Sequence, residues 1–267
     1  MPDQTKYTAK LTGSRILVIG GSSGIGFCVA EACTENGALV TISSSNKTRV
    51  GNAVEKIKAS YPSAKDRVFG LTVDLSKPDT LENDLKTLLE GTVKEMGGEK
   101  LDHVVFTAGD KLAIVKLEDM TMQNIVAAGQ IRFFAPLLLA KFLPTYLHST
   151  HKSSYTITTG SIAEKPSPDW SVVGSYAGGH QAMVRALALD MKPIRVNGVS
   201  PGAVDTELWD HHYGKEQKEG IMQGMEGKMA TGRVGRPEDV AETYLGILRD
   251  ANMDGSMVQS NGGGMLM

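Results

Sequence analysis

The sequence is poor in cysteine, in long apolar runs and in surplus charge, and each shortage excludes a class of protein. Its 267 residues contain two cysteines, Cys28 and Cys33, whose five-residue spacing suits neither a disulfide nor a CxxC site. We expect both to be buried thiols of a protein from a reducing compartment, the cytoplasm. No run approaches the roughly 20 apolar residues that span a bilayer, and the polar segment 1–10 lacks the apolar stretch of a secretory signal.

Charge and histidine content exclude two further classes. The formal net charge is −2, so there is no basic surplus for nucleic acid or an anionic membrane. The six histidines are scattered apart from the pair His211-His212, and no carboxylate-rich neighbourhood completes a metal site. We therefore expect no metal, no nucleic acid and no membrane, with a small molecule as the binding partner.

Short, nearly continuous β-branched runs alternate with helical stretches from residue 14 onward, a pattern typical of strands buried on both faces. This alternation, with right-handed crossovers, predicts an α/β fold: a doubly wound parallel sheet of the Rossmann type with helices on both faces. A length of 267 residues fits one domain, 1–267, that begins with an N-terminal extension at 1–13. We expect a helix at 24–36 and strands at 15–19, 38–42, 68–73, 101–107, 154–159, 194–199 and 257–260.

Segment 206–231 differs from the rest of the chain because its apolar residues are set among glycines. Trp209 and three methionines, Met222, Met225 and Met229, are interleaved with four glycines. This composition predicts a mobile lid over a binding site or, equally well, a surface helical hairpin with a methionine-filled interface.

A glycine-rich turn, Gly20-Gly-Ser-Ser-Gly-Ile-Gly26, joins the first predicted strand to its helix. Glycines permit a tight turn and close backbone approach, and the helix N-terminus presents free N–H groups to a pyrophosphate. The next strand leads into Ser43-Ser-Ser-Asn-Lys-Thr-Arg49, which has no Asp or Glu to select the free 2′-hydroxyl of NAD. Its hydroxyls, Asn46, Lys47 and Arg49 offer donors to a 2′-phosphate. The alternative is a polar capping loop, but the missing carboxylate favours NADP(H).

Several motifs in the same order resemble those of the short-chain dehydrogenase/reductase family over nearly the whole chain. The glycine turn matches the family's Gly-xxx-Gly-x-Gly pattern, Thr107-Ala-Gly109 resembles its Asn-Ala-Gly segment, and residues 195–202 resemble the strand and turn before its nicotinamide-contacting Thr. Segments 235–241 and 261–263 complete the resemblance. It implies an NADP(H)-dependent oxidoreductase whose cofactor-binding residues are Gly20, Ser22, Ser23, Gly24, Ile25, Gly26, Ser44, Ser45, Asn46, Asp74, Leu75, Thr107, Ala108, Gly109, Pro201, Gly202 and Thr206.

The resemblance also implies a catalytic Asn, Ser, Tyr and Lys, and of these the serine alone has a match, Ser161. Counting back from Arg195 places the Tyr position at Val173 and the Lys position at Ala177. A slip of one residue gives two glycines instead, so neither register restores a proton donor.

Two further positions bear on this missing set. The Asn position falls near Gln130 or Ile131, so the Asn is also absent. Tyr176 and His180 lie four residues apart on one helical face, but they are three residues out of register. We expect both to pack rather than to react.

The loop after the fifth predicted strand offers other candidates. Asp169 and Trp170 follow two prolines that stiffen the loop, and ligands bind at this edge of such sheets. With Arg132 they would line a pocket that faces the nicotinamide, although Asp169 could instead cap a helix and Trp170 could belong to the core. Reduction of a carbonyl leaves an alkoxide that needs a proton, whereas an iminium accepts hydride without one. Asp169 would hold such a cation and Trp170 would add a cation–π contact.

We therefore predict Asp169, Arg132, Trp170 and Ser161 as the catalytic residues. The first three resemble the set of a divergent fungal branch that lacks the Tyr–Lys pair, the reductase/Diels–Alderases of the malbrancheamide and paraherquamide type. That resemblance implies iminium reduction with NADPH followed by an intramolecular 4+2 cycloaddition.

The leading hypothesis is an NADPH-dependent reductase of a small biosynthetic intermediate, an iminium or activated carbonyl of fungal secondary or alkaloid metabolism. The alternatives are a bifunctional or non-redox cyclase that retains NADP, and a catalytically silent NADP-binding protein. The family resemblance further implies a homo-oligomer, dimer or tetramer, paired through helices at 121–147 and 173–191. Phe133, Phe134 and residues 137–139 suit such an interface or the core equally well.

Overall fold

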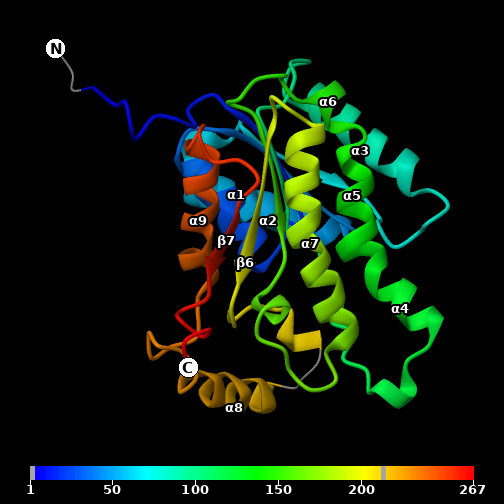
Figure 1. The fold of residues 1–267 in the computed structure, drawn as a ribbon. Helices are drawn as coiled ribbons and strands as arrows, with labels where there is room; N and C mark the ends of the chain where they lie inside the picture. The colour runs from blue at the N-terminus through cyan, green and yellow to red at the C-terminus, as the bar shows by residue number, and fades with distance from the viewer. Residues whose placement is uncertain (1–3, 212–214) are drawn as a thin grey trace.

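The computed structural model describes residues 4–211 and 215–267 and contains a seven-stranded sheet in which all neighbouring strands are parallel (Figure 1). The strand order is β3-β2-β1-β4-β5-β6-β7, so the order reverses between β1 and β4. This is the doubly wound arrangement that the sequence predicts. The strands are β1 Arg15–Ile19, β2 Leu39–Ser44, β3 Val68–Thr72, β4 His103–Phe106, β5 Ser154–Thr158, β6 Arg195–Pro201 and β7 Met257–Ser260.

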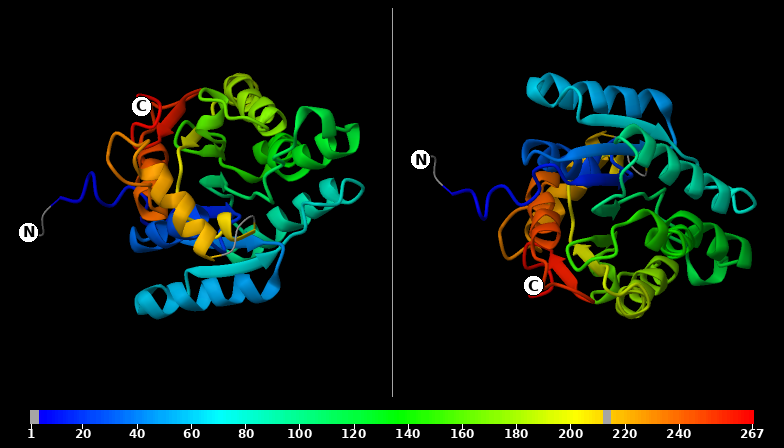
Figure 2. Two further views of the ribbon diagram at one scale, coloured as in Figure 1. Left: turned by 90° about the horizontal axis from the view of Figure 1, so that it is seen from below. Right: turned by 90° about the horizontal axis from the view of Figure 1, so that it is seen from above.

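Two layers of helices cover the sheet, as the continuously apolar strands require. On one face, α1 (Gly24–Glu35), α2 (Lys47–Ser60) and α9 (Pro237–Arg249) enclose a core that includes Phe27, Val54 and Tyr244. On the other face, α3 (Leu81–Glu95), α5 (Ala135–Ala140) and α7 (Ser171–Asp190) enclose a core that includes Leu85 and Leu139. The end-on views in Figure 2 show the sheet between these layers.

The region predicted as one helix at 121–147 is a continuous helical path with an irregular centre. It consists of α4 (Met122–Gly129), one π-helical turn (Gln130–Phe134), α5 and, after a turn, α6 (Leu143–Tyr146). The main-chain N–H of Ala135 donates to the carbonyl of Gln130, which is the i→i+5 bond of a π turn. Such turns occur most often at functional sites.

Several segments lie outside the two layers. Short 3₁₀ turns form at Pro62–Ala64, Leu117–Asp119, Ser161–Ala163 and Trp209–His211, and α8 (Lys215–Glu226) lies across the carboxyl edge of the sheet (Figure 1). In the N-terminal extension, the described part is anchored by Leu11, which is buried in the core beneath α9.

Both cysteines are free and buried, as predicted, and burial is the main reason that the pKa of each thiol rises to about 12. Over residues 4–211 and 215–267, no helix is long and apolar enough to cross a membrane. The same residues contain no group of three or more His, Cys, Asp or Glu side chains placed to hold a metal.

A buried arginine joins three parts of the fold at the start of β6. Arg195 is 3% exposed and donates to the main-chain carbonyls of His151, Lys152, Ile247 and Met253 at 2.7–3.4 Å. We expect Arg195→Met to lower the free energy of unfolding by about 3 kcal/mol, because buried carbonyls lose a charged donor. Chemical denaturation measures this loss. Arg185→Met, at an exposed position on α7, should change the same quantity by less than about 0.5 kcal/mol, and an equal effect of both variants would contradict the assignment.

Candidate active site

A cleft of about 1010 Å³ lies at the carboxyl edge of the sheet, where the strand order reverses. Ligands bind at this switch point in open α/β sheets. The volume stands at the upper end of the range for ligand pockets, so a dinucleotide and a small substrate would have room together. The lining comes from the turns after β1, β2, β3, β4, β5 and β6, from one side of α7 and from the segment around α8.

The turn between β1 and α1 makes one wall of the cleft. A Cβ at Gly26 would lie 2.3 Å from Thr107 Oγ1 and 2.4 Å from the Gly20 carbonyl oxygen, and Gly20 itself has a φ of +90°. The Ser23 N-cap of α1 makes no side-chain capping bond, so the N–H groups of the first helical turn face the cleft without that partner. The predicted residues of this turn, Gly20, Ser22, Ser23, Gly24, Ile25 and Gly26, all line the cleft.

The far end of the cleft is polar. Ser44, Ser45 and Arg49 line it where β2 meets α2, together with Asp74 and Leu75 after β3. The Asp74 carboxylate accepts from the Ser76 N–H at 3.0 Å and the Ser76 hydroxyl at 2.6 Å, and these bonds are the main cause of its lowered pKa.

Asn46 is the one predicted cofactor residue that does not line the cleft. Its side-chain oxygen instead accepts from the Arg49 N–H at 2.9 Å and caps α2. The sequence allowed both a phosphate donor and a cap, and the structure corrects the prediction for Asn46 in favour of the cap.

The middle of the cleft contains the remaining predicted cofactor residues. Thr107, which stands in place of the family's Asn, donates its hydroxyl to the Ile19 carbonyl at 3.0 Å and so ties the end of β4 to β1. Across the cleft, Thr206 packs beside Gly24. These two line the cleft together with Ala108, Gly109, Pro201 and Gly202.

Arg132 enters the cleft from the π turn. Its Nε donates to Asp110 Oδ1 at 3.1 Å, and its Nη2 donates to the Asp110 carbonyl. A Cβ at Gly109 would lie 2.7 Å from Arg132 Nη1, so the guanidinium rests directly on that glycine. Burial lowers the pKa of Arg132, and the Asp110 carboxylate opposes this effect.

Two of the other predicted catalytic residues lie in the same cleft. Ser161 lines it from the 3₁₀ turn after β5, and Trp170 lines it at the start of α7. Trp170 also packs against the cluster formed by Trp209, Met222 and Val234, so it contributes to packing as well as to the cleft.

Asp169 is not brought to this cleft, which corrects the predicted placement of its carboxylate. The residue is exposed, has a φ of +66°, and its main-chain carbonyl accepts from the Val115 N–H at 2.9 Å. It does not cap α7 either, because the N-cap is Trp170 and lacks a side-chain capping bond. Ser167, two residues earlier, lines the cleft instead. Periodicity gives no information about loop side chains, and the left-handed backbone at Asp169 decides which residue faces inward.

The side of α7 that faces the cleft includes Val173, Tyr176, Ala177 and His180. The Tyr176 hydroxyl donates to the Ile125 carbonyl at 3.0 Å, and its ring packs 5.1 Å from that of Phe133. His180 is 3% exposed, and burial is the main cause of its lowered pKa. Both side chains line the cleft and bond to groups outside α7, Tyr176 to Ile125 and His180 to Arg132 and Thr159, and the packing role expected for them stays a prediction.

Gln130 and Ile131, near the predicted Asn position, have different environments. Gln130 is buried and donates its amide to the Leu75 carbonyl at 3.1 Å, which joins the π turn to the loop after β3. Ile131 lines the cleft. Neither brings an Asn-like amide to the reacting centre.

Sequence reasoning missed several cleft residues from outside the recognised motifs. Lys165 Nζ donates to the Gly264 carbonyl at 2.7 Å and to the Met267 carbonyl, so it holds the C-terminal segment beside the cleft. Leu112 and Ala113 follow the Thr107-Ala-Gly109 segment, while Ser167 precedes Trp170. Their nearness to known motifs is the one signal that could have found them.

Segment 206–231 forms a cover beside the substrate end, apart from His212, Tyr213 and Gly214, which lie outside the described residues. Met225 and Met229 line the cleft, and Met222 packs with Trp209 beneath α8. Of these residues, α8 supplies Met222 and Met225, Met229 follows that helix, and Trp209 lies on the 3₁₀ turn before it. Lys218 on α8 bonds to Asp205 and Asp210 at 2.9 Å each. Burial opposes its charge, but these two bonds raise the pKa of Lys218 overall.

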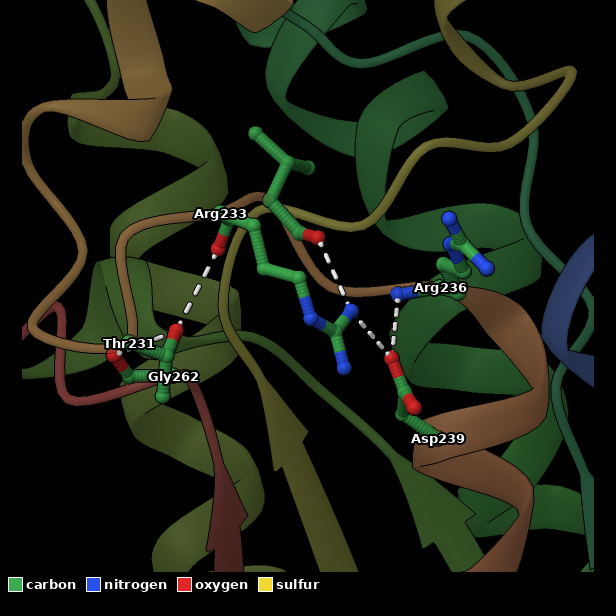
Figure 3. A network of polar contacts seen from close by, with 6 residues as sticks. Thr231, Arg233, Arg236, Asp239 and Gly262 are labelled. Atoms are coloured by element: carbon green, nitrogen blue, oxygen red, sulfur yellow. Dashed lines mark hydrogen bonds and ion pairs between the residues drawn. The ribbon is translucent and has the colours of Figure 1, made fainter.

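The end of this segment is fixed by the polar network in Figure 3. Arg233 Nη1 donates to Asp239 Oδ2 at 2.6 Å, and the same carboxylate oxygen accepts from the Arg236 N–H at 3.0 Å. Thr231 donates both its N–H and its hydroxyl to the Gly262 carbonyl. The network joins segment 206–231 to α9 and to the turn after β7, which gives a physical reason for the motifs at 235–241 and 261–263.

The fold and the site now define the class of protein. A model of the SDR-like Rossmann domain matches residues 7–267. The chain therefore belongs to the short-chain dehydrogenase/reductase family, and it is an oxidoreductase with the fold and cleft for a nicotinamide cofactor.

Its relatives include fungal proteins of the branch that the sequence predicts. Short-chain dehydrogenase/reductase fsr5 of Gibberella fujikuroi is 47% identical over 262 residues, which cover 98% of each chain. Short-chain dehydrogenase/reductase malC of Malbranchea aurantiaca is 42% identical over 261 residues, or 96% of each chain. The solved MalC reductase/Diels-Alderase from the same organism superposes with a TM-score of 0.91 at 41% identity and covers 98% of this chain and 100% of that one. These similarities confirm the predicted resemblance to this fungal branch.

The Lys218 ion pairs predict how firmly α8 is held to the cleft. Because the Lys218 side chain is 18% exposed and bonds to two carboxylates, we expect Lys218→Met to weaken the attachment by about 1 kcal/mol. Limited proteolysis within segment 206–231 should then become several-fold faster. Lys86→Met removes an exposed pair with Glu90 on α3 and serves as the matched control. Equal cleavage rates in the Lys218 variant and the parent would contradict an anchoring role.

Proposed function

We propose that this chain is an NADPH-dependent reductase that transfers hydride to a small biosynthetic intermediate whose acceptor carbon is already activated. An iminium or an activated carbonyl has this property. The observation that carries the proposal is that Val173 and Ala177, at the positions implied for Tyr and Lys, line the cleft with aliphatic side chains. Neither side chain can deliver a proton, and the Tyr176 hydroxyl, which also lines the cleft, donates to the Ile125 carbonyl. A substrate that needs no proton at the hydride step therefore fits best.

The charges at the substrate end support the same class of substrate. The nicotinamide supplies the hydride when it is bound, and the protein supplies orientation and electrostatics. Since Arg132 is paired with Asp110, its charge is compensated, and a cationic acceptor would not meet an unbalanced guanidinium. Trp170 offers a cation–π partner for an iminium. For an activated carbonyl, the Ser161 hydroxyl and the Arg132 N–H groups would hold the oxygen.

NADP(H) is the cofactor that the polar end of the cleft supports. Ser44, Ser45 and Arg49 line that end, and they provide the hydroxyls and the cation that recognise a 2′-phosphate. Asp74 is the acidic residue that lines the same end, and its carboxylate is already bonded to Ser76 and paired with Lys77 at 3.4 Å. It is therefore poorly placed to select a free 2′-hydroxyl.

The cover at 206–231 and the assembly complete the proposal. Main-chain bonds between Asp205 and Gly235 and between Gly235 and Ala203 bring the two ends of the cover together, so the cover can move as a lid without disturbing the sheet.

The helical path 122–140 exposes the apolar side chains of Met122, Val126 and Leu137, and these side chains support pairing into a homo-oligomer. Phe133, in contrast, packs against the core.

A second activity, cyclisation, is favoured by the similarity to the MalC reductase/Diels-Alderase. The apolar side chains at the substrate end, among them Trp170, Leu208 and Met225, would fold a flexible substrate into a compact shape. Product analysis after reduction distinguishes this candidate, since a cyclase yields a cyclised, stereochemically pure product and a simple reductase yields an open amine.

The experiment that tests the main proposal is single-turnover mixing of the protein and NADPH with a model cyclic iminium, N-methyl-3,4-dihydroisoquinolinium. The matched carbonyl is 1-tetralone. Loss of nicotinamide absorbance with the iminium at a higher rate than with the ketone supports the proposal. Faster reduction of the ketone would overturn the argument from Val173 and Ala177. Bound NADPH without oxidation by either compound would favour the non-redox alternatives.

The assignment of NADP(H) predicts a change in cofactor preference. We expect Arg49→Ser to weaken NADPH binding about 10-fold or more through loss of a charge-assisted contact, and to leave NADH binding within about twofold. Fluorescence titration with both dinucleotides measures the two dissociation constants. Lys47→Ser removes a neighbouring positive charge that does not line the cleft and should affect NADPH much less. An equal loss for NADPH and NADH in Arg49→Ser would point to a role outside 2′-phosphate recognition.

The catalytic candidates differ in their expected importance because they differ in position. We expect Arg132→Gln to lower kcat about 100-fold, as loss of a positioned charged donor does, with NADPH affinity little changed. Asp169→Asn, at the exposed loop position, should lower kcat by less than about threefold. Steady-state kinetics with the iminium measures both variants. A large loss in Asp169→Asn alone would restore the sequence-based assignment of Asp169 and require the loop to close on the substrate.

A further inference from the structure

His180 is a buried imidazole that lines the cleft, and the proposed function gives it no task. It is 3% exposed and lines the cleft from α7. Its two ring nitrogens have different partners: Nε2 lies 2.9 Å from the main-chain carbonyl oxygen of Arg132, and Nδ1 lies 3.1 Å from Thr159 Oγ1.

These contacts determine the tautomer. A carbonyl oxygen can only accept, so Nε2 carries the proton and donates it to Arg132. In the neutral ring Nδ1 is then an acceptor, and the Thr159 hydroxyl proton lies between Nδ1 at 3.1 Å and the Ala177 carbonyl at 3.3 Å. Burial lowers the pKa of His180, the bond to the Arg132 carbonyl opposes this effect, and the nearby Arg132 charge lowers the pKa further. The neutral ring with a proton on Nε2 is therefore the form that satisfies both partners.

The bonded carbonyl belongs to the π turn that aims Arg132. Arg132 lies at the centre of this π turn, and from there its guanidinium contacts Gly109 and Asp110. The turn also fits closely against α7: a Cβ at Gly129 would lie 2.6 Å from the Tyr176 hydroxyl, and the Phe133 ring lies 5.4 Å from the His180 ring. His180 thus bonds to the main chain of Arg132, and Asp110 holds the side chain of the same residue.

We propose that His180 is a positioning residue that fixes the π turn through its Nε2–H and thereby aims the Arg132 guanidinium into the cleft. The inference rests on the catalytic role proposed for Arg132. It goes beyond that role by assigning to His180 the task of holding the main chain of Arg132.

Two substitutions separate the two ring nitrogens. The amide nitrogen of Gln reaches approximately as far as Nε2, and that of Asn reaches approximately as far as Nδ1. His180→Gln therefore keeps a donor for the Arg132 carbonyl, whereas His180→Asn keeps only a group beside Thr159. His103 is a matched control, because it is also buried and its Nδ1 bonds to Ser154 Oγ at 2.8 Å, at the first residues of β4 and β5.

The direct readout is hydrogen exchange of the Arg132 Nε–H in the NADPH complex, followed by ¹⁵N NMR and assigned by its absence in Arg132→Gln. We expect His180→Asn to accelerate this exchange at least about 10-fold, and His180→Gln and His103→Asn to leave it within about threefold. Unchanged exchange in His180→Asn would overturn the proposal. Should His180→Asn fail to fold, the ¹⁵N shifts of the wild-type ring decide: an Nε2–H tautomer supports the proposal, and an Nδ1–H tautomer refutes it.

Kinetics supply a second test that a merely structural role would fail. With the model iminium, His180→Asn should lower kcat about 10-fold or more and leave the dissociation constant of NADPH within about twofold, with His180→Gln recovering most of kcat. In an Arg132→Gln background the effect of His180→Asn on kcat should fall below about twofold, while any loss in Tm remains. The same kcat loss in both backgrounds would overturn the proposal. Absence of turnover in the wild type would refute the proposed function and leave the exchange experiment to test His180 alone.

Discussion

The close approach of the β1–α1 turn to the end of β4 is the constraint on which the cleft depends. Gly20 and Gly26 leave no space for side chains against Thr107 and Ala108, and the Thr107 hydroxyl bonds across to the Ile19 carbonyl. This contact holds together the two strands between which the sheet changes direction. The first turn of α1 and the residues after β4 therefore face the same space, and every other wall of the cleft is placed relative to them.

The positions of the strands were predictable from the sequence. The directions of side chains that depend on the backbone of a single loop or turn were not. All seven strands were expected, and β1 and β7 have the expected bounds, because a strand buried on both faces leaves an unbroken apolar run. The glycine turn was recognisable for a similar reason, since few residues fit there. Asp169 and Asn46 show the opposite case. Their side-chain directions depend on a positive φ and on a helix cap, and neither leaves a periodic signal.

The π turn at Gln130–Phe134 illustrates a second limit. The helical region 121–147 was expected from the family resemblance, and Arg132, singled out on it in the same way, lines the cleft. One additional residue in a turn changes no apolar pattern, yet it changes which side chain reaches Gly109. The partners that keep this turn, Gln130 on Leu75 and His180 on the Arg132 carbonyl, come from residues 55 and 48 positions away. Such long-range bonds become visible only when the packing is known.

The same bonds order the end of the cleft at which we propose that hydride transfer takes place. In a site that donates a proton, a charged lysine and a phenol have to be held near each other and near the cofactor. Here the face of α7 toward the cleft carries Val173, Tyr176, Ala177 and His180. The polar groups there bond within the protein: Arg132 to Asp110, Tyr176 to the Ile125 carbonyl, and His180 to Thr159 and to the π turn. A low-dielectric pocket with compensated charges strengthens the interaction of any remaining donor with a bound substrate. The Asp110 partner of Arg132 and the bond from His180 to its carbonyl are therefore two parts of one arrangement, which fixes both the direction and the charge balance of Arg132.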